Sequence, residues 1–322
     1  MIARRLASFA AASVVALEFA VMPAACASAQ AGPARAIAPA ARASVDTAKL
    51  RHTLDSIADA HHGTVGYTVV DIDRGLRVSR RGDETFPTAS LIKVAVLATV
   101  YDLVAQHKLS LDDKLTVLPI DKVPGSGQLQ FLHDGAEITV HDAAWFMTTI
   151  SDNTATNLLL DRIIIRRVWE KMEALGLPHT KVHSKTFLRS SSVAMDSSVK
   201  YGLGVTTPNE MATLFELLAR GRAVNPTADS TMLDILEHNE DNQMLQRFAG
   251  GVRAAHKTGA TDAVRTECSL FYLASRVVAC VMTKDNADQR WVIDTEPQVT
   301  MARMGEAIVN AWGPPTASQT TP

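Results

Sequence analysis

Ser90 and Lys93 stand three residues apart in the apolar stretch PTASLIKVAVLATV, residues 87–100. This stretch is typical of a buried helix, and residues three positions apart lie on one face of a helix. Burial disfavours the charged form of an amine, so a buried lysine loses its proton more readily than an exposed one. Lys93 could then accept the hydroxyl proton of Ser90 and activate that serine as a nucleophile.

The start of the predicted helix would assist the same chemistry. The backbone N–H of Ser90 would point at a developing oxyanion, with the helix dipole behind it. Taken alone, however, this spacing is a weak signal, because it recurs at Ser197 and Lys200 in a polar loop to which we assign no meaning. Lys93 could also pack its stem in the core and extend its ammonium group to solvent.

Two later motifs favour the catalytic interpretation. Ser151-Asp152-Asn153 follows a predicted helix over 141–150, and Lys257-Thr258-Gly259 lies in a predicted strand over 254–260. The three motifs occur in order on a helix start, a helix junction and a strand, which makes a strong set. Together they would bring a nucleophile, a second hydroxyl, an amide and a second ammonium group around one point.

The composition and the N-terminus restrict the function further. The chain has 322 residues and a net charge of −2, and no basic stripe appears in it. This composition argues against a function in nucleic-acid binding. Arg4 and Arg5 precede an apolar run, and Ala27-Ser28-Ala29 forms a small-residue cleavage site. We therefore expect residues 1–29 to be a signal peptide cleaved after Ala29, with lipidation of Cys26 as the alternative. The mature protein would be periplasmic or secreted, without stable membrane insertion.

The remaining elements predict one catalytic domain over 47–313, between an Ala/Pro-rich linker at 30–46 and a disordered tail at 314–322. Strand patterns occur at 64–72, 76–80, 254–260, 265–273 and 276–283. Helical patterns occur at 47–63, 141–150, 153–161, 166–175, 207–220, 228–238 and 298–312. We expect a two-lobed α/β (α+β) fold. An antiparallel sheet lobe (about 47–86 and 240–313) would hold an inserted helical lobe (about 87–239).

The cysteines and histidines do not suggest a metal centre or a cofactor. Cys268 and Cys280 lie in neighbouring predicted strands, and we favour two small buried apolar residues there. A disulfide is the alternative in an oxidising compartment, because a turn near Ala274 or Ser275 would place the two cysteines nearly opposite each other. The pair at 61–62 is interpreted as the end of a helix.

The chain resembles the penicillin-recognising serine enzymes, most closely the class A β-lactamases, over about 47–313. The likeness extends beyond the three motifs to VPGSGQL at 123–129, SDNTATNLLLDRI at 151–163, VTTPNEMATLFELLARG at 205–221 and HKTGAT at 256–261. The fold of that family is an antiparallel sheet with flanking helices and a helical lobe, with the active site between them. This arrangement agrees with the order of elements predicted above.

The resemblance also implies roles in catalysis. Ser90 would be the acylated nucleophile and Lys93 the base that activates it. Ser151 would relay the proton to the β-lactam nitrogen as the amide bond breaks. The N–H groups of Ser90 and Ala260 would form the oxyanion hole, in which a donor is typically worth about 3 kcal/mol.

Substrate-binding roles follow in the same way. Asn153 would bind the side-chain amide of the substrate. Lys257, Thr258 and Gly259 would form the site for the substrate carboxylate, and Lys257 would raise the local positive potential. Arg265, on the next strand, would either supplement this carboxylate site or be an ordinary surface arginine.

One expected residue is absent. Class A enzymes hydrolyse the acyl-enzyme with a water activated by a glutamate in the loop between the second motif and the TTP helix start. From 174 to 209 the only carboxylate is Asp196, which we keep as a possible deacylation base, since Glu173 belongs to the predicted helix 166–175. Ile163-Ile164-Ile165 replaces a turn that often contains glycine in related chains, which favours a helix that continues and shifts this loop.

Acylation and deacylation each need a proton transfer, and a well-placed base contributes about 10²–10⁴-fold. The sequence therefore predicts a serine hydrolase that opens β-lactam rings, with deacylation that could be slow. Two alternatives share the nucleophile: a peptidase acting on D-alanyl-D-alanine ends of peptidoglycan, and a β-lactam-binding protein that stays acylated. The sequence leaves open the accepted β-lactam classes and the oligomeric state.

Overall fold

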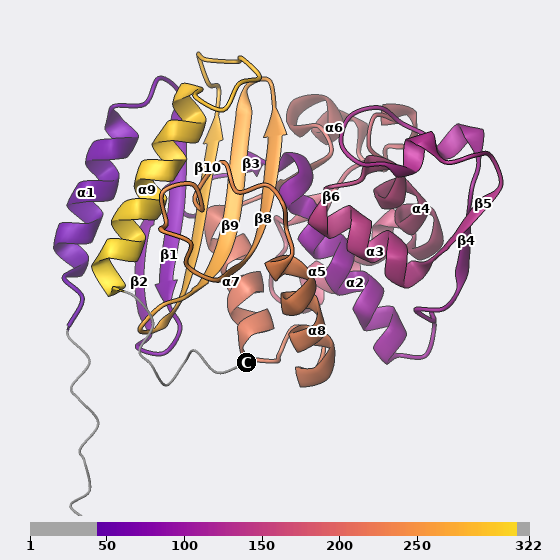
Figure 1. The fold of residues 1–322 in the computed structure, drawn as a ribbon, viewed down its shortest axis with the longest axis horizontal. Coiled ribbons are helices and arrows are strands. Elements are labelled where there is room, and N and C mark those ends of the chain that lie inside the picture. The colour runs from indigo at the N-terminus through magenta and orange to yellow at the C-terminus, as the bar shows by residue number, and fades with distance from the viewer. Residues whose placement is uncertain (1–43, 314–322) are drawn as a thin grey trace, which may run out of the picture. The chain divides into compact units, whose positions relative to one another are not determined.

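A five-stranded antiparallel sheet joins the two ends of the domain (Figure 1). In the computed structural model, which describes residues 44–313, its strand order is β2-β1-β10-β9-β8. The strands are β1 (Thr64–Asp71), β2 (Leu76–Arg80), β8 (Ala254–Thr261), β9 (Val264–Tyr272) and β10 (Arg276–Lys284). β1 pairs with β10, so the predicted early and late strands form one sheet. The predicted signal peptide, most of the linker and the tail lie outside the described residues.

Helices cover both faces of this sheet and fill the other half of the domain (Figure 1). They are α1 (Thr47–Asp59), α2 (Lys93–Ala105), α3 (Val140–Thr149), α4 (Asn153–Ile163), α5 (Ile165–Ala174), α6 (Met195–Tyr201), α7 (Pro208–Ala219), α8 (Pro226–Glu237) and α9 (Glu296–Trp312). One smaller sheet consists of β3 (Phe86–Pro87), β6 (Lys181–Val182) and β7 (Gly204–Thr206). Another consists of β4 (Lys114–Val117) and β5 (Ala136–Thr139). The observed architecture is the predicted α/β fold. Among the described residues, no helix is both long enough and apolar enough to cross a membrane.

The strands alternate their side chains between two cores, because successive residues of a strand point to opposite faces. On β10, Ala279 and Val281 pack under α1 and α9. Val278 and Met282 belong to the second core, which lies on the other side of the sheet and continues into the helical half. α7, which the sequence interpretation placed in the helical lobe, packs against β1, β9 and β10 instead. The two lobes therefore share one core.

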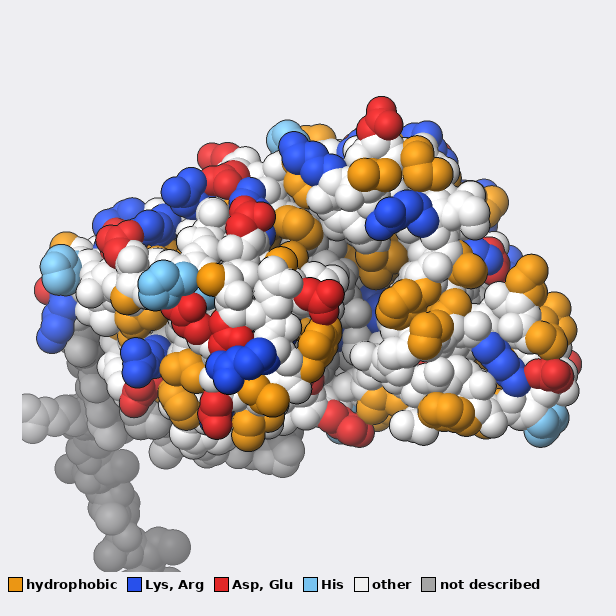
Figure 2. Space-filling model, turned by 90° about the horizontal axis from the view of Figure 1, so that it is seen from above, with side chains coloured by type: hydrophobic (Ala, Val, Ile, Leu, Met, Phe, Trp, Pro, Cys, Tyr) orange, Lys and Arg blue, Asp and Glu red, His pale blue; other side chains and the backbone are white. Residues whose placement is uncertain are grey.

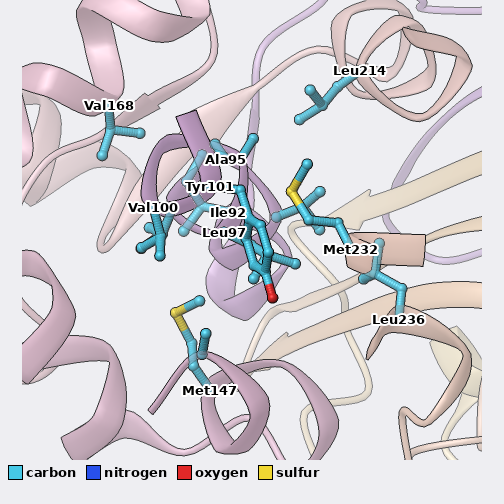
Figure 3. Close-up of a cluster of buried hydrophobic side chains, with 14 of the residues drawn as sticks. Ile92, Ala95, Leu97, Val100, Tyr101, Met147, Val168, Leu214, Met232 and Leu236 are labelled. Carbon is cyan, nitrogen blue, oxygen red and sulfur yellow. The ribbon is translucent and has the colours of Figure 1, made fainter. Parts of the chain in front are cut away.

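Helix α2 passes through the centre of this shared core. It is apolar on every side and buried at ten of its residues, as expected for a helix surrounded by other elements. Figure 3 shows residues from α2, including Leu97 and Tyr101, packed with Met147 of α3 and Met232 of α8. The start of α2 is therefore held firmly, and it carries the first of the three motifs.

The predicted continuous helix through Ile163-Ile164-Ile165 is wrong. α4 ends at Ile163, α5 begins at Ile165, and Ile164 between them has a φ of 67°. Ile164 is 56% exposed, whereas Ile163 and Ile165 are 1% and 7% exposed. The break lets both flanking side chains enter the core, and this burial compensates for a backbone conformation that a β-branched residue seldom adopts.

The favoured interpretation of the cysteines is also wrong, because Cys268 and Cys280 form a disulfide. The two residues lie directly opposite each other in the register of β9 and β10, whose turn is centred on Ala274. Directly opposed residues of antiparallel strands point to the same face of the sheet. Both side chains lie in the shared core on the α7 side, where Cys268 contacts the backbone carbonyl of Met211.

Candidate active site

The predicted nucleophile lies on a short 3₁₀ turn rather than inside an α-helix. This turn covers Ala89–Ile92, and α2 begins only at Lys93. In a 3₁₀ turn, residues three positions apart lie almost directly above one another, so Ser90 and Lys93 still share one side. Ala89 has a φ of 46°, a region that costs an ordinary residue about 1–2 kcal/mol. The surrounding structure therefore holds the backbone next to Ser90 in a strained conformation.

Gly259 allows the third motif to approach this turn. A Cβ atom on Gly259 would lie 2.4 Å from the carbonyl oxygen of Thr88 and 2.7 Å from the backbone nitrogen of Leu91. Only glycine lets β8, an edge strand of the sheet, pass so close to the backbone that precedes Ser90. The next residue, Ala260, consequently lines the same cavity as Ser90.

The Lys93 amine is buried at the centre of the site. Lys93 is only 1% exposed, so the alternative interpretation, in which its ammonium group extends to solvent, is wrong. Nζ donates hydrogen bonds to the carbonyl oxygen of Ser151 at 2.7 Å, to Ser151 Oγ at 3.2 Å and to Asn153 Oδ1 at 2.9 Å. Burial lowers the pKa of Lys93 well below its usual range, the charge of Lys257 lowers it further, and Asp152 opposes both effects.

Ser151 connects the two buried lysines. Lys257 Nζ donates to Ser151 Oγ at 3.2 Å and to the carbonyl oxygen of Thr258 at 2.9 Å. Burial lowers the pKa of Lys257 to about 8, although the carboxylates of Asp241 and Glu267 favour its charged form. Ser151 itself has a φ of 58° between α3 and α4. Its hydroxyl oxygen therefore lies within hydrogen-bond distance of both amines.

Asp152 has a structural role in the second motif. It caps α4 by accepting from the backbone N–H of Ala155 at 2.8 Å, and its other oxygen accepts from Gln128 and Leu129 at 2.6 and 2.9 Å. These bonds attach the 123–129 loop to the start of α4.

Asn153 strengthens this connection. Its Nδ2 donates to the carbonyl oxygen of Pro124 at 3.1 Å, and its backbone N–H donates to that of Ser126 at 3.0 Å. Ser126 thereby enters the wall of the site. No sequence pattern assigned a role to Ser126, although residues 123–129 resemble the corresponding segment of the family.

Two adjoining cavities are lined by residues of the three motifs. Figure 2 shows the surface hollowed between the sheet side and the helical side of the domain. The larger has a volume of about 770 Å³ and the smaller about 360 Å³. Both are lined by Ser90, Ser126, Ala260 and Trp291. Asn153 lines the larger cavity, while Ser151, Thr258 and Gly259 line the smaller. The structure thus brings the three motifs together.

Arg265 is found in neither of its two predicted places, because it lines neither cavity and is not a surface arginine. It is 1% exposed, and its guanidinium donates to the carbonyl oxygens of Thr261, Val264 and Arg290. The guanidinium also lies 4.8 Å from the ring centre of Trp291, which lines both cavities. Arg265 therefore supports an aromatic wall of the site from behind. No sequence pattern marked Trp291.

The position of Asp196 also differs from the one that its predicted role as a deacylation base requires. It lies in the first turn of α6 with its side chain exposed, and it does not line the larger or the smaller cavity. The short helix turns Asp196 outward while it buries Ser198 at 1% exposure.

The histidine pair at the end of α1 contacts the C-terminal part of the domain. His61 contacts Asn286 and His62 contacts Glu296, at 2.9 Å in each case. Among residues 44–313, no group of three or more His, Cys, Asp or Glu side chains is arranged to hold a metal ion.

Comparison with known proteins identifies the family. The sequence model described as the Beta-lactamase enzyme family matches residues 49–312. The chain belongs to this β-lactamase family. It is accordingly a hydrolase of the serine β-lactamase type, and the predicted resemblance and fold are confirmed.

Individual relatives agree with this assignment. Beta-lactamase L2 of Stenotrophomonas maltophilia is 27% identical over 218 residues, which cover 64% of this chain and 67% of that protein. A solved β-lactamase from Sphaerobacter thermophilus is 28% identical, with a TM-score of 0.74 over 84% of this chain and 98% of its own. PBP-A is 25% identical, with a TM-score of 0.72, and the match covers 82% of this chain and 96% of PBP-A. A PBP-A mutant was solved as an acyl-enzyme complex with penicillin G.

Proposed function

We propose that this β-lactamase-family protein opens β-lactam rings through an acyl-enzyme on Ser90 and releases the product slowly. The observation that carries the proposal is the position of Ser151 Oγ, 3.2 Å from each of two buried lysine amines in a cavity that Ser90 lines. This arrangement supplies both a proton acceptor and a proton relay beside the nucleophile.

The acylation step follows from these contacts. Neutral Lys93 accepts the hydroxyl proton of Ser90, and Ser90 Oγ attacks the carbonyl carbon of the lactam. As the C–N bond breaks, Ser151 donates its proton to the ring nitrogen and regains one from Lys93, so that the amine returns to its neutral form. The product of this step is an ester between Ser90 and the opened ring.

Binding of the substrate would use residues of all three motifs around the two cavities. The backbone N–H groups of Ser90 and Ala260 would stabilise the oxyanion, at about 3 kcal/mol per donor. Lys257, with Thr258 and Gly259 in the smaller cavity, would bind the carboxylate of the substrate. Asn153 lines the larger cavity, where the substrate's side-chain amide would compete with the carbonyl oxygen of Pro124 for its Nδ2 group.

Slow release is supported by the lining of the larger cavity, which among the described residues contains neither aspartate nor glutamate. A deacylating base worth about 10²–10⁴-fold is therefore missing on that side of Ser90. Intact-protein mass spectrometry with benzylpenicillin, followed over time alongside product release, is expected to show an adduct that persists for hours. Rapid decay with repeated turnover would contradict slow release, and a protein without any adduct would contradict the whole proposal.

A second candidate function is a peptidase that acts on D-alanyl-D-alanine ends of peptidoglycan stem peptides. The larger cavity, whose described lining contains no carboxylate, favours it, as does the likeness to PBP-A. A protein that binds β-lactams and stays acylated would share the same site. Release of D-alanine from a D-alanyl-D-alanine peptide, measured beside the penicillin adduct, separates the peptidase from the other two.

We also propose that the protein is exported to the periplasm or secreted. The proposal is supported by the signal-peptide pattern of residues 1–29 and by the Cys268–Cys280 disulfide, since such bonds persist in oxidising compartments. N-terminal sequencing of the mature protein tests it, with Gln30 expected as the first residue.

The acylation rate is expected to decline as the pH rises through about 8. The pKa of Lys257 is about 8, and above it the ammonium that would bind the substrate carboxylate loses its charge, despite nearby Asp241 and Glu267. Lys93 must be neutral to act as a base, and burial, which lowers its pKa well below the usual range, favours this neutral form. Acylation rate constants measured across the pH range check this prediction. Lys257→Arg should move the alkaline decline upward, and an unmoved decline would assign it to another group.

A further inference from the structure

Thr186 lines the larger cavity and carries a buried hydroxyl. The residue is 8% exposed and lines the cavity, and its Oγ1 has no hydrogen-bond partner among the described residues. Buried side-chain hydroxyls are nearly always hydrogen-bonded, to protein or to ordered water. The hydroxyl of Thr186 is therefore available to a molecule inside the cavity.

The backbone of Thr186 is held in a fixed position by one side chain. Asn157 Oδ1 accepts from the N–H of Thr186 at 2.7 Å, and Asn157 Nδ2 donates to its carbonyl oxygen at 3.1 Å. Asn157 lies fully buried on α4. These two bonds attach the loop at this point to the same helix that carries Asn153.

The same helix places Thr186 near the catalytic amine. Asn153 and Asn157 are four residues apart, so they lie on one face of α4, about 6 Å apart along its axis. Asn153 Oδ1 accepts from Lys93 Nζ at 2.9 Å. Adjacent side chains of one helix face thus hold the Lys93 amine and Thr186, and the cavity that Thr186 lines also contains Ser90.

We infer that the Thr186 hydroxyl holds the water that hydrolyses the Ser90 acyl-enzyme. This inference rests on the proposed function. The water oxygen attacks the carbonyl carbon of the ester while its proton passes to neutral Lys93. The bond between that carbon and Ser90 Oγ then breaks, and Lys93 returns the proton to Ser90, which leaves free enzyme and a carboxylic acid product.

The alternatives in the same cavity are less well placed. Ser198 Oγ is also buried without a partner, but it comes from α6 and has no hydrogen bond to α4. A hydroxyl can orient a water but does not remove its proton at neutral pH. Thr186 therefore only orients the water, and the proton passes to Lys93.

The test compares Thr186→Val, Thr186→Ser and Thr186→Glu with the parent protein. Acylation and deacylation rate constants are measured separately, by mass spectrometry of the penicillin adduct before and after excess penicillin is removed. Thr186→Val is expected to slow deacylation about tenfold, since it loses one hydrogen bond to the water, and Thr186→Ser is expected to restore it. Thr186→Glu should accelerate deacylation by about 10²-fold or more, because a carboxylate can accept the proton. Acylation should change little in all three.

Thr148→Val is the matched control. Thr148 is a buried threonine with an unpartnered hydroxyl, but it lines neither cavity, so deacylation should stay at the parent rate. Unchanged deacylation in Thr186→Val, or an equal loss in Ser198→Ala, would overturn the inference. A parent protein that forms no adduct would instead contradict the proposed function, which keeps the two failures distinct.

Discussion

Replacing Ser90 with alanine is expected to abolish covalent labelling by benzylpenicillin. Ser90 Oγ is the only atom that the proposed mechanism joins to the opened ring, and alanine keeps the backbone N–H that would contribute to the oxyanion hole. The substitution removes one hydroxyl from a residue that is already partly exposed in the cavity, so the fold should be unaffected. Intact-protein mass spectrometry measures the adduct, and thermal unfolding checks the fold.

Ser126→Ala is the informative control for this result. Ser126 also lines both cavities, so its hydroxyl is an alternative nucleophile in the cavity wall. The Ser126 variant should still form the adduct, although its rate can change. Persistent labelling of Ser90→Ala would show that the nucleophile has been assigned to the wrong residue.

Replacing Lys93 with alanine should slow acylation by about 10²–10⁴-fold, the usual contribution of a well-placed base. The amine hydrogen-bonds to both Ser151 and Asn153, and burial together with the charge of Lys257 lowers its pKa, which favours the neutral form that accepts a proton. Acylation rate constants from the appearance of the penicillin adduct measure the effect. Ser90 remains present, so a slow residual reaction should still be visible.

A second lysine that contacts α2 separates loss of the base from loss of stability. Lys171 Nζ forms an ion pair with Asp102 of α2 at 2.7 Å and is largely buried, yet it lies outside both cavities. Lys171→Ala should therefore acylate at the parent rate. If Lys93→Ala also acylates at that rate while folded by near-ultraviolet circular dichroism, Lys93 does not act as the base.

Much of the site could be predicted because the catalytic groups occur as short motifs on strongly patterned elements. Ser90 and Lys93 are neighbours in the chain, so local geometry alone places them on one side of a turn. The strand patterns over 265–273 and 276–283 predicted this part of the sheet, and a turn near Ala274 or Ser275 would have placed Cys268 and Cys280 nearly opposite each other. Whether these cysteines pair could not be decided, since a shift of one residue would have separated them.

Other assignments failed because they depend on burial, which a single residue type does not reveal. Arg265 and Asp196 are both charged; Arg265 lies shortly after the third motif, and Asp196 lies in the loop that was expected to hold the deacylation base. One is buried behind Trp291 and the other points into solvent. Ile164 looked like part of a helix, but two flanking isoleucines gain more from burial than the broken helix loses.

The sequence by itself determined the family, the fold class and the order of the three motifs, because these depend on local pattern and on residue types that few folds combine. Only the tertiary structure decided how the residues that line the cavities are held in place. Thr186 is held by Asn157, and Trp291 is supported by Arg265, through contacts between segments that are far apart in the chain. Such contacts arise from the packing of the whole domain, so no pattern within either segment could have predicted them.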